Sequence, residues 1–172
     1  AVPGVVIAIF SLLIFNYSIE KWFDKKINEA VNNSTEIAKR YLNEHQSSIG
    51  KDILLVANDF NRNSSKLKND LKSFQNYISL QAKVRSLNKI FLINSNGVLK
   101  YFQDEKSKNE FTKPDAYILS AAKSGKPIII SSAYTNKTYV LVKLNNFEDL
   151  FIYVVQNVDP KIVNYLKKTG EV

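Results

Sequence analysis

The sequence predicts an α+β protein in which long N-terminal helices precede a five-stranded antiparallel sheet, with a transmembrane helix at the start. Residues 1–19 contain no charged side chain, and apolar residues at helical spacing follow them. Five short apolar runs come next, separated by turn-forming residues. The first two runs form a hairpin and the last three are consecutive, so a single sheet with a short crossover helix is the simplest arrangement.

The composition is that of a folded domain without cysteine chemistry. The 172 residues are 45% hydrophobic and include ten Phe and nine Tyr side chains, which is enough to build a core. The absence of Cys excludes disulfides, thiolate catalysis and Cys-ligated metal sites, and a single His leaves no His cluster. The net charge is +8, but the basic residues are scattered in runs no longer than two, which argues against nucleic-acid binding. We therefore expect no cofactor, no metal and no nucleic-acid partner for this chain.

The uncharged run over residues 1–19 is long enough to span a bilayer as a helix, which needs about 20 apolar residues. Tyr17 and Trp22 fall where an aromatic belt at the membrane interface would lie. A buried core helix is the alternative, but the abrupt change in polarity at Glu20 favours the membrane. Three Lys residues between positions 21 and 26 would place that side in the cytoplasm by the positive-inside rule, so charge alone does not assign the orientation.

Residues 20–88 are expected to form a membrane-proximal long helix and further helical segments. Between residues 16 and 45, apolar or small residues recur in steps of four and three, which is the spacing of a helix seam. This stripe would cover the sheet, pair with the same stripe of a second copy in a dimer, or do both. Residues 45–50 are predicted to break or bend the helix, before helical segments over 51–62 and 67–87. The stripe consists of Phe23, Ile27, Ala30, Ser34, Ile37 and Tyr41.

The predicted sheet occupies residues 89–158, and a C-terminal helix occupies residues 159–172. The Asn96-Gly97 pair supplies the first hairpin turn, because it adopts positive φ at low cost. A polar loop over 103–113 leads to a short helix over 116–123, and Asp159-Pro160 begins the last helix. The strands are expected at residues 89–94, 98–102, 127–133, 138–144 and 150–156.

Short pieces spread along nearly the whole chain are characteristic in their order and spacing, although none is a strong motif alone. They are Phe15-Asn16, Trp22-Phe23-Asp24, Ala38, Tyr41-Leu42, His45, Ala57-Asn58-Asp59, Asn61-Arg62, Gln81-Ala82, Arg85, Asn94-Ser95-Asn96-Gly97 and Val158-Asp159-Pro160. Together they resemble the sensor portion of NtrY-type transmembrane histidine kinases of the nitrogen-regulation two-component system. The order of elements also resembles the PAS-like arrangement of Cache sensor domains, in which a long N-terminal helix packs along one face of the sheet.

This resemblance implies a topology and a set of partners. Membrane spans flank an extracytoplasmic sensor, and HAMP, PAS and kinase modules follow inside the cell. The chain would then be a periplasmic sensor domain, dimeric, anchored in the bacterial inner membrane and followed by a second span that it does not include. It carries no phosphoacceptor His in an H-box and no ATP lid, so we expect no catalytic residues in it. ATP and Mg²⁺ would belong to the kinase module, which would phosphorylate an NtrX-type response regulator.

A small-molecule pocket is the predicted functional site. Cache domains bind ligands between the sheet and its short helices, where polar anchors line an aromatic cavity. A cation with several Tyr hydroxyls suits an anionic or zwitterionic ligand. Ordinary strand composition is the alternative, because Tyr favours strands. The candidate ligand-binding residues are Arg85, Tyr101, Tyr134, Tyr139, Lys143 and Tyr153.

Two acidic residues are expected to have structural roles. Asp59 and Arg62 are spaced for a local helical ion pair, which contributes a few tenths of a kcal/mol. Asp115 follows Pro114 at a predicted helix start, where the helix dipole favours a carboxylate.

The function predicted from the sequence is signal sensing, with a conformational change transmitted through the membrane to a cytoplasmic kinase. Two alternatives stay open. A chemoreceptor sensor domain would have the same fold, and a membrane-anchored scaffold would bind no ligand. Thermal-shift screening against small metabolites separates the scaffold from the sensors, because no ligand would stabilise a scaffold.

Overall fold

A computed structural model of the chain describes residues 2–68, 70–132 and 136–170. The contacts divide the chain into two units, Ala1–Tyr41 and Leu42–Val172. Helix α1, which runs from Val2 to Arg62, contributes residues to both units, and every later element belongs to the second.

In the first unit, α1 exposes its apolar side chains. Ile7, Phe10 and Leu13 leave 66%, 64% and 63% of their surface accessible, and the large apolar residues of the predicted stripe are exposed as well. Charged pairs such as Glu36 with Arg40, at 2.6 Å, lie on the helix surface. Within the described residues, no helix contains a segment long and apolar enough to cross a membrane, so the span expected over residues 1–19 is not confirmed.

The predicted break over residues 45–50 is wrong, because α1 continues through it without interruption. Gly50 is buried, and a Cβ atom built on it would lie 2.9 Å from Cδ1 of Ile129 on strand β3 (Ile128–Ser132). Glycine is unfavourable inside a helix by about 1 kcal/mol relative to Ala. Here it allows the helix to approach the strand closely, so it marks a contact rather than a helix end.

Two helices follow in place of the single helix predicted over residues 67–87. Helix α2 spans Ser64–Leu67 and helix α3 spans Leu71–Val84. Asp70 begins α3, because its carboxylate accepts hydrogen bonds from the backbone N–H two residues further on (2.9 Å) and from the Ser73 hydroxyl (2.5 Å). This N-cap satisfies donors that the first turn of a helix leaves free.

The predicted five-stranded antiparallel sheet is confirmed, with the strand order β2-β1-β5-β4-β3. Strand β5 is central and pairs antiparallel with both β1 and β4. Each observed strand boundary lies within one residue of the predicted one. The other strands are β1 (Lys89–Ile93), β2 (Leu99–Phe102), β4 (Lys137–Lys143) and β5 (Phe151–Asn157).

Three short helices complete the second unit. Helix α5 (Ala116–Ala122) is the predicted crossover, and helix α6 (Pro160–Lys168) is the predicted final helix. The segment predicted as a polar loop instead contains helix α4 (Glu105–Asn109). Its N-cap is Asp104, whose carboxylate accepts hydrogen bonds from the backbone N–H and the hydroxyl of Ser107, both at 2.7 Å. These bonds lower the pKa of the Asp104 carboxyl.

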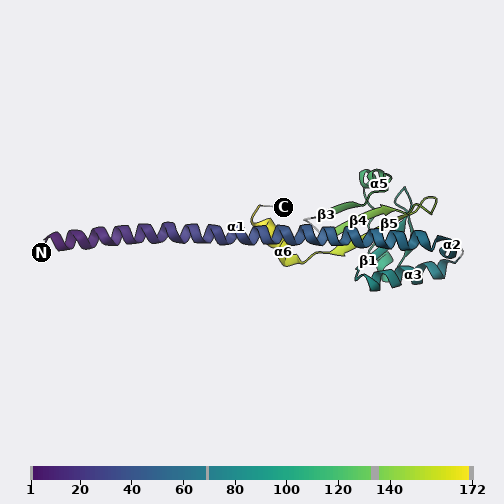
Figure 1. The fold of residues 1–172 in the computed structure, drawn as a ribbon, viewed down its shortest axis with the longest axis horizontal. Helices are drawn as coiled ribbons and strands as arrows, with labels where there is room; N and C mark the ends of the chain where they lie inside the picture. Colours follow the sequence, from purple (N-terminus) through teal and green to yellow (C-terminus); the bar gives the residue numbers. More distant parts are fainter. Residues whose placement is uncertain (1, 69, 133–135, 171–172) are drawn as a thin grey trace. The chain divides into compact units, whose positions relative to one another are not determined.

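The sheet has a separate apolar cluster on each face, and α3 and α5 lie on opposite sides of it (Figure 1). On one face, residues of α1 and α3 such as Ile53, Phe60 and Phe74 pack against the strands. On the other face, Leu119 and Ala122 of α5 pack against them. Because side chains alternate along a strand, β1, β4 and β5 contribute buried residues to both clusters.

Candidate functional site

A pocket of about 390 Å³ opens on the sheet face that carries α5. Strands β3, β4 and β5 form its floor, and residues 112–115 with α5 form its rim. The volume lies at the lower end of the range that small-molecule sites occupy. Its lining consists of Thr112, Lys113, Pro114, Asp115, Ile118, Ile128, Ile130, Ser131, Tyr139, Leu141 and Tyr153.

Two tyrosines form the aromatic part of the floor. Tyr139 on β4 and Tyr153 on β5 have ring centroids 6.0 Å apart and planes 8° from parallel. Leu141 lies directly opposite Tyr153 in the strand register, so the two rings occupy diagonal positions, within reach of each other. Phe91 and Phe111 contact the Tyr153 ring from other directions, with centroids at 6.1 and 6.2 Å. The stack is therefore anchored in the apolar cluster on this face.

The Tyr153 hydroxyl stays protonated at physiological pH. Only 4% of the residue is exposed, and burial raises the pKa of its hydroxyl, with smaller contributions from Tyr139 and Asp115. A neutral phenol both donates and accepts hydrogen bonds. The floor of the pocket thus offers a ligand an uncharged polar group.

The rim carries one cation and one carboxylate, Lys113 and Asp115, on either side of the buried Pro114. The Lys113 side chain lies over the first hairpin turn, since a Cβ built on Gly97 would fall 2.8 Å from Lys113 Cε. Gly97 also has a φ of +74°, so both its conformation and the space around it require glycine. Asp115 occupies the start of α5 as predicted, but its carboxylate makes no capping hydrogen bond.

The structure brings two of the six predicted ligand-binding residues, Tyr139 and Tyr153, into this pocket. Lys143 lies two pleats beyond Tyr139 and by strand alternation shares its face, but it is not part of the lining. Tyr134 lies outside the described residues.

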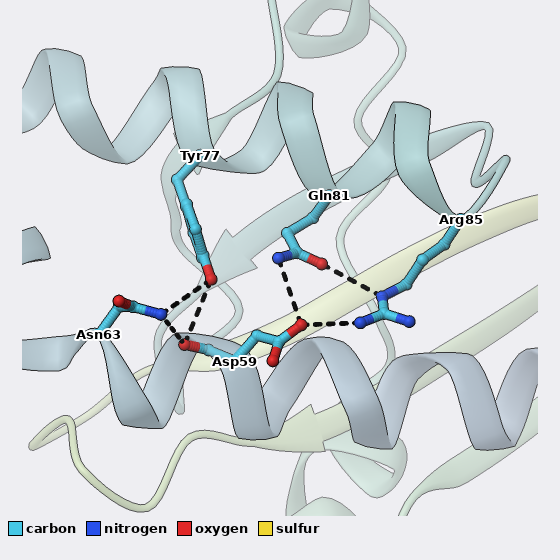
Figure 2. Close-up of polar contacts among 5 residues, drawn as sticks. All are labelled: Asp59, Asn63, Tyr77, Gln81 and Arg85. Atoms are coloured by element: carbon cyan, nitrogen blue, oxygen red, sulfur yellow. Dashed lines mark hydrogen bonds and ion pairs between the residues drawn. The ribbon is translucent and has the colours of Figure 1, made fainter.

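Arg85 lies on the opposite side of the sheet, at the end of α3, where it faces α1 (Figure 2). Its Nη2 donates to Asp59 Oδ2 at 2.7 Å, and its Nε donates to Gln81 Oε1 at 3.1 Å. The Gln81 amide also donates to Asp59, at 3.4 Å. The predicted pair of Asp59 with Arg62 is wrong, because α3 brings Arg85 alongside as the partner. With 19% and 28% of their side chains exposed, Arg85 and Asp59 are screened less than a surface pair.

The same network continues into the last turn of α1 (Figure 2). The Asn63 amide donates to the Asp59 carbonyl at 2.8 Å and to the Tyr77 hydroxyl at 3.0 Å. The Tyr77 hydroxyl lies 3.4 Å from the same carbonyl, to which it donates. The Asp59 carbonyl also accepts from the backbone N–H of Asn63 at 3.1 Å, and the Tyr77 contacts fasten α3 to the end of α1.

Tyr101 also belongs to the helix-covered face. It stacks on Phe74 with ring centroids 4.2 Å apart and planes 7° from parallel. It packs against the apolar cluster of α1 and α3, so it serves the core of that face.

Thr112, Lys113 and Asp115 line the pocket but are not among the predicted ligand contacts. The first two lie at the end of a segment interpreted as a polar loop, and Asp115 was interpreted as a helix start. A signal for all three was present, because they immediately precede the crossover helix, and ligand sites in this arrangement lie between the sheet and its short helices. In the described part of the chain, no group of three or more His, Cys, Asp or Glu side chains is placed to hold a metal ion.

Comparison with known proteins gives a match along the entire chain. Residues 1–172 match the family described as the NtrY N-terminal region. The chain is 28% identical over 170 residues to Nitrogen regulation protein NtrY of Azorhizobium caulinodans, which covers 99% of this chain and 22% of that protein. It is 29% identical over 172 residues to proteins of Rickettsia felis and Rickettsia prowazekii that are named NtrY-like sensor histidine kinases, covering 99% of this chain and 28% of each. The chain thus spans about a quarter of the length of these curated relatives, and the resemblance inferred from its sequence is confirmed.

Proposed function

This chain belongs to the family of NtrY N-terminal regions, and we propose from that premise that it is the signal-sensing region of a two-component sensor histidine kinase in nitrogen regulation. The observation that carries the proposal is the pocket on the α5 face, with its aromatic floor and charged rim. A concave, mostly apolar site with a few convergent polar groups is what recognition of a small molecule requires.

We assign residues 89–158 to a PAS-like Cache domain. The strand order β2-β1-β5-β4-β3 supports this assignment, as do the helix packed on one face and the pocket on the other. Residues 20–88 would then be the helical input segment, and residues 159–172 would lead into a second membrane span.

The exposed apolar side chains of the first unit support a membrane location. Ile7, Phe10 and Leu13 leave most of their surface accessible, as do Ile9 and Leu12 between them. A helix that is apolar on all sides needs an apolar environment, either a protein core or a membrane. Residues 1–19 would contact the bacterial inner membrane, with the second unit in the periplasm.

Strand β3 is the proposed link between the pocket and α1. Ile130 lines the pocket, whereas its neighbour Ile129 lies against Gly50 of α1 on the other side of the strand. Gln46 of α1 also donates a hydrogen bond to the Ser131 hydroxyl at 2.6 Å. A ligand that moves β3 would therefore change the packing of α1 on the sheet. The difference between the ligand's affinities for the two packing states of α1 would set the signal passed to the kinase.

The rest of the signalling path lies in the full-length protein. A shift of α6, which directly follows β5, would pass through the second span to the kinase module. That module would use ATP and Mg²⁺, act as a homodimer and phosphorylate an NtrX-type response regulator.

The residues predicted as ligand contacts divide between two roles in this proposal. Tyr139 and Tyr153 would contact the ligand in the pocket. Arg85 and Tyr101 would lie on the sheet face covered by α1 and α3, where the packing would change. Lys143 and Tyr134 stay predicted contacts for a ligand that extends beyond the pocket.

Filling the pocket in the full-length kinase tests the proposal. Ile130→Trp places an indole beside Tyr139, its direct neighbour in the strand register. We expect it to change autophosphorylation in membrane vesicles by about fivefold or more, the usual size of a coupling between two sites. Tyr117→Trp is the matched control, because Tyr117 is 79% exposed on α5 and lies outside the pocket. Autophosphorylation equal to that of wild type in a folded Ile130→Trp protein would contradict the proposal.

A further inference from the structure

We infer that α2 and the exposed side of α3 form a docking surface for another protein, which binds through an acidic, amphipathic segment. This α2–α3 surface consists of a groove between the two helices, an apolar stripe along α3 and the basic side chains around them. It is separate from the pocket on the α5 face. Its shape and its charge each restrict the partner.

The groove between α2 and α3 has a volume of about 340 Å³ and an apolar floor. The Tyr77 ring and the side chains of Leu67 and Leu80 form this floor, and Lys66 also lines the groove. Figure 2 shows Tyr77 extending from α3 to Asn63, whose amide donates to its hydroxyl at 3.0 Å. The ring is therefore held in place, and the groove exists before a partner binds.

An exposed apolar stripe continues the groove along α3. Tyr77, Leu80 and Val84 follow one another in steps of three and four residues, so they lie on the same side of the helix. Leu80 and Val84 leave 53% and 69% of their surface exposed, whereas Phe74 and Ile78 on the opposite side are buried. A continuous exposed apolar patch with a polar border is characteristic of a protein interaction site.

The segment that forms this surface is strongly basic. Residues 61–85 contain six basic side chains and one acidic side chain, so they carry +5 of the net charge of +8. The acidic residue is Asp70, whose carboxylate caps α3. No run of basic residues is longer than two, so the concentration of charge comes from the fold rather than from a sequence motif. The basic residues are Arg62, Lys66, Lys68, Lys72, Lys83 and Arg85.

The protein itself engages only part of this charge. Arg85 binds the Asp59 carboxylate at 2.7 Å, and Lys68 lies 5.5 Å from the centre of the Phe147 ring. Lys72 lies near the carboxylate that caps α3. The cations that are exposed and form no ion pair within the described part of the chain are Arg62, Lys66 and Lys83.

The basic side chains border the apolar stripe. Lys72 and Lys83 lie eight residues before and three residues after Leu80, which places both on its side of α3. Lys66 lies across the groove on α2. A partner helix with an apolar face would fill the groove and cover the stripe, and carboxylates beside that face would pair with the lysines.

Two other occupants fit this surface less well. A second copy of the chain, paired through the same surface, would bring two groups of positive charge together, which is unfavourable. A nucleic acid would supply phosphates for the lysines but no apolar side chain to cover Leu80 and Val84. The combination of stripe and charge therefore favours a different, acidic protein.

Fluorescence anisotropy of the full chain with a labelled amphipathic peptide tests the inference. In this peptide, Leu recurs at helical spacing and Glu fills the other positions. One matched peptide has Gln in place of Glu, and another has Ser in place of Leu. Labelled oligothymidylate supplies negative charge without apolar side chains. We expect saturable binding of the Glu/Leu peptide, at least about tenfold tighter than binding of the other three probes.

Leu80→Ser tests the apolar stripe. It should weaken binding of the Glu/Leu peptide about tenfold, because a leucine that the partner would bury is lost. Leu54→Ser is the matched control, since Leu54 is 42% exposed on α1 and lies outside the groove. It should leave the affinity unchanged.

A triple variant, Lys66→Gln with Lys72→Gln and Lys83→Gln, tests the basic border. It should weaken binding of the Glu/Leu peptide about tenfold or more and reduce the dependence of the affinity on salt. A control triple variant makes the same change in net charge and should change the affinity by less than about twofold. It replaces three exposed lysines outside the α2–α3 surface by Gln, namely Lys100, Lys123 and Lys126.

Three results would overturn the inference. They are no saturable binding of the Glu/Leu peptide, equal affinity for oligothymidylate, and equal weakening by the two triple variants. The last result would mean that the peptide responds to net charge alone. The kinase test with Ile130→Trp concerns the pocket on the other face of the sheet, so failure of either proposal leaves the other standing.

Discussion

The two faces of the sheet use similar side chains for different purposes. On the face covered by α1 and α3, Tyr101 stacks against Phe74, and Arg85 is held by Asp59. On the α5 face, Tyr139 and Tyr153 stack with each other but border a pocket, and the charged residues at its rim have no partner among the described residues. On the first face Arg85 and Tyr101 are already engaged by other side chains of the protein, whereas the second face leaves a pocket and unpaired charge at its rim. In the proposed function, stability and ligand binding belong to opposite faces of one sheet.

The comparison shows that residue type alone does not define a site. From the sequence, Arg85 is a reasonable ligand contact. In the structure it instead binds the Asp59 carboxylate of α1 at 2.7 Å. From the sequence, Asp115 is a reasonable helix cap. In the structure its carboxylate accepts no hydrogen bond from the backbone of α5. The distinguishing property is whether the protein itself already satisfies the group.

The largest effect on stability is expected in the centre of the helix-covered face. Phe74 is 2% exposed and contacts the rings of Phe60, Tyr101 and Phe147. Phe74→Ala should lower the free energy of unfolding by about 3–5 kcal/mol, because it leaves a cavity in a packed core. Urea unfolding followed by circular dichroism measures the change. Tyr117→Ala, at a 79% exposed position on α5, should change it by less than about 0.5 kcal/mol. Equal effects of the two substitutions would remove the distinction between the faces.

The ion pair between Asp59 and Arg85 should have an intermediate effect. Asp59→Ala leaves a half-buried guanidinium without its carboxylate and should cost about 1–3 kcal/mol in the free energy of unfolding. A double-mutant cycle with Arg85→Met should give a coupling energy of about 1 kcal/mol, since the two side chains are mostly shielded from water. Glu36 and Arg40 form a matched exposed pair, at 62% and 78% side-chain exposure, and should show coupling of a few tenths of a kcal/mol. If the coupling energy between Asp59 and Arg85 were no larger than that of the exposed pair, the network would not fasten α3 to α1.

The smallest effect at neutral pH is expected on the pocket face, where Tyr153→Phe removes a hydroxyl from the floor. The change in stability at pH 7 should be within about 0.5 kcal/mol. Burial raises the pKa of this hydroxyl above its unfolded value, so its contribution to folding is fully present below about pH 10 and is lost as the pH rises above that. Tyr153→Phe should therefore reduce the loss of stability between pH 9 and pH 11, measured by urea unfolding at each pH. Tyr117→Phe should leave that loss unchanged, and an identical loss in both variants would show that Tyr153 ionises freely.

The strands and most helices could be predicted from the sequence because their signals are local. Alternating or continuous apolar runs with turn residues such as Gly97 between them define the strands, and Asp159-Pro160 defines the start of α6. The predicted break over residues 45–50 failed for a physical reason. Gly50 is required by contact with Ile129, which lies 79 residues further along the chain, and a local pattern does not contain that contact.

The candidate site could be predicted only in part. Tyr139 and Tyr153 were found because they lie in strands on one face of the sheet. The partner of Arg85 was missed because it lies 26 residues away on another helix. Lys113 and Asp115 were missed because they lie in a polar segment between two elements. Only the tertiary structure shows that this segment borders a pocket on the sheet.

In the proposed mechanism, occupancy of the pocket changes the packing of α1 through β3. Hydrogen exchange of backbone amides, compared between the wild-type chain and Ile130→Trp, tests this most directly. We expect altered exchange in β3 and also in residues 46–60 of α1, on the far side of the sheet. Altered exchange confined to the residues around the pocket, with residues 46–60 unchanged, would contradict it.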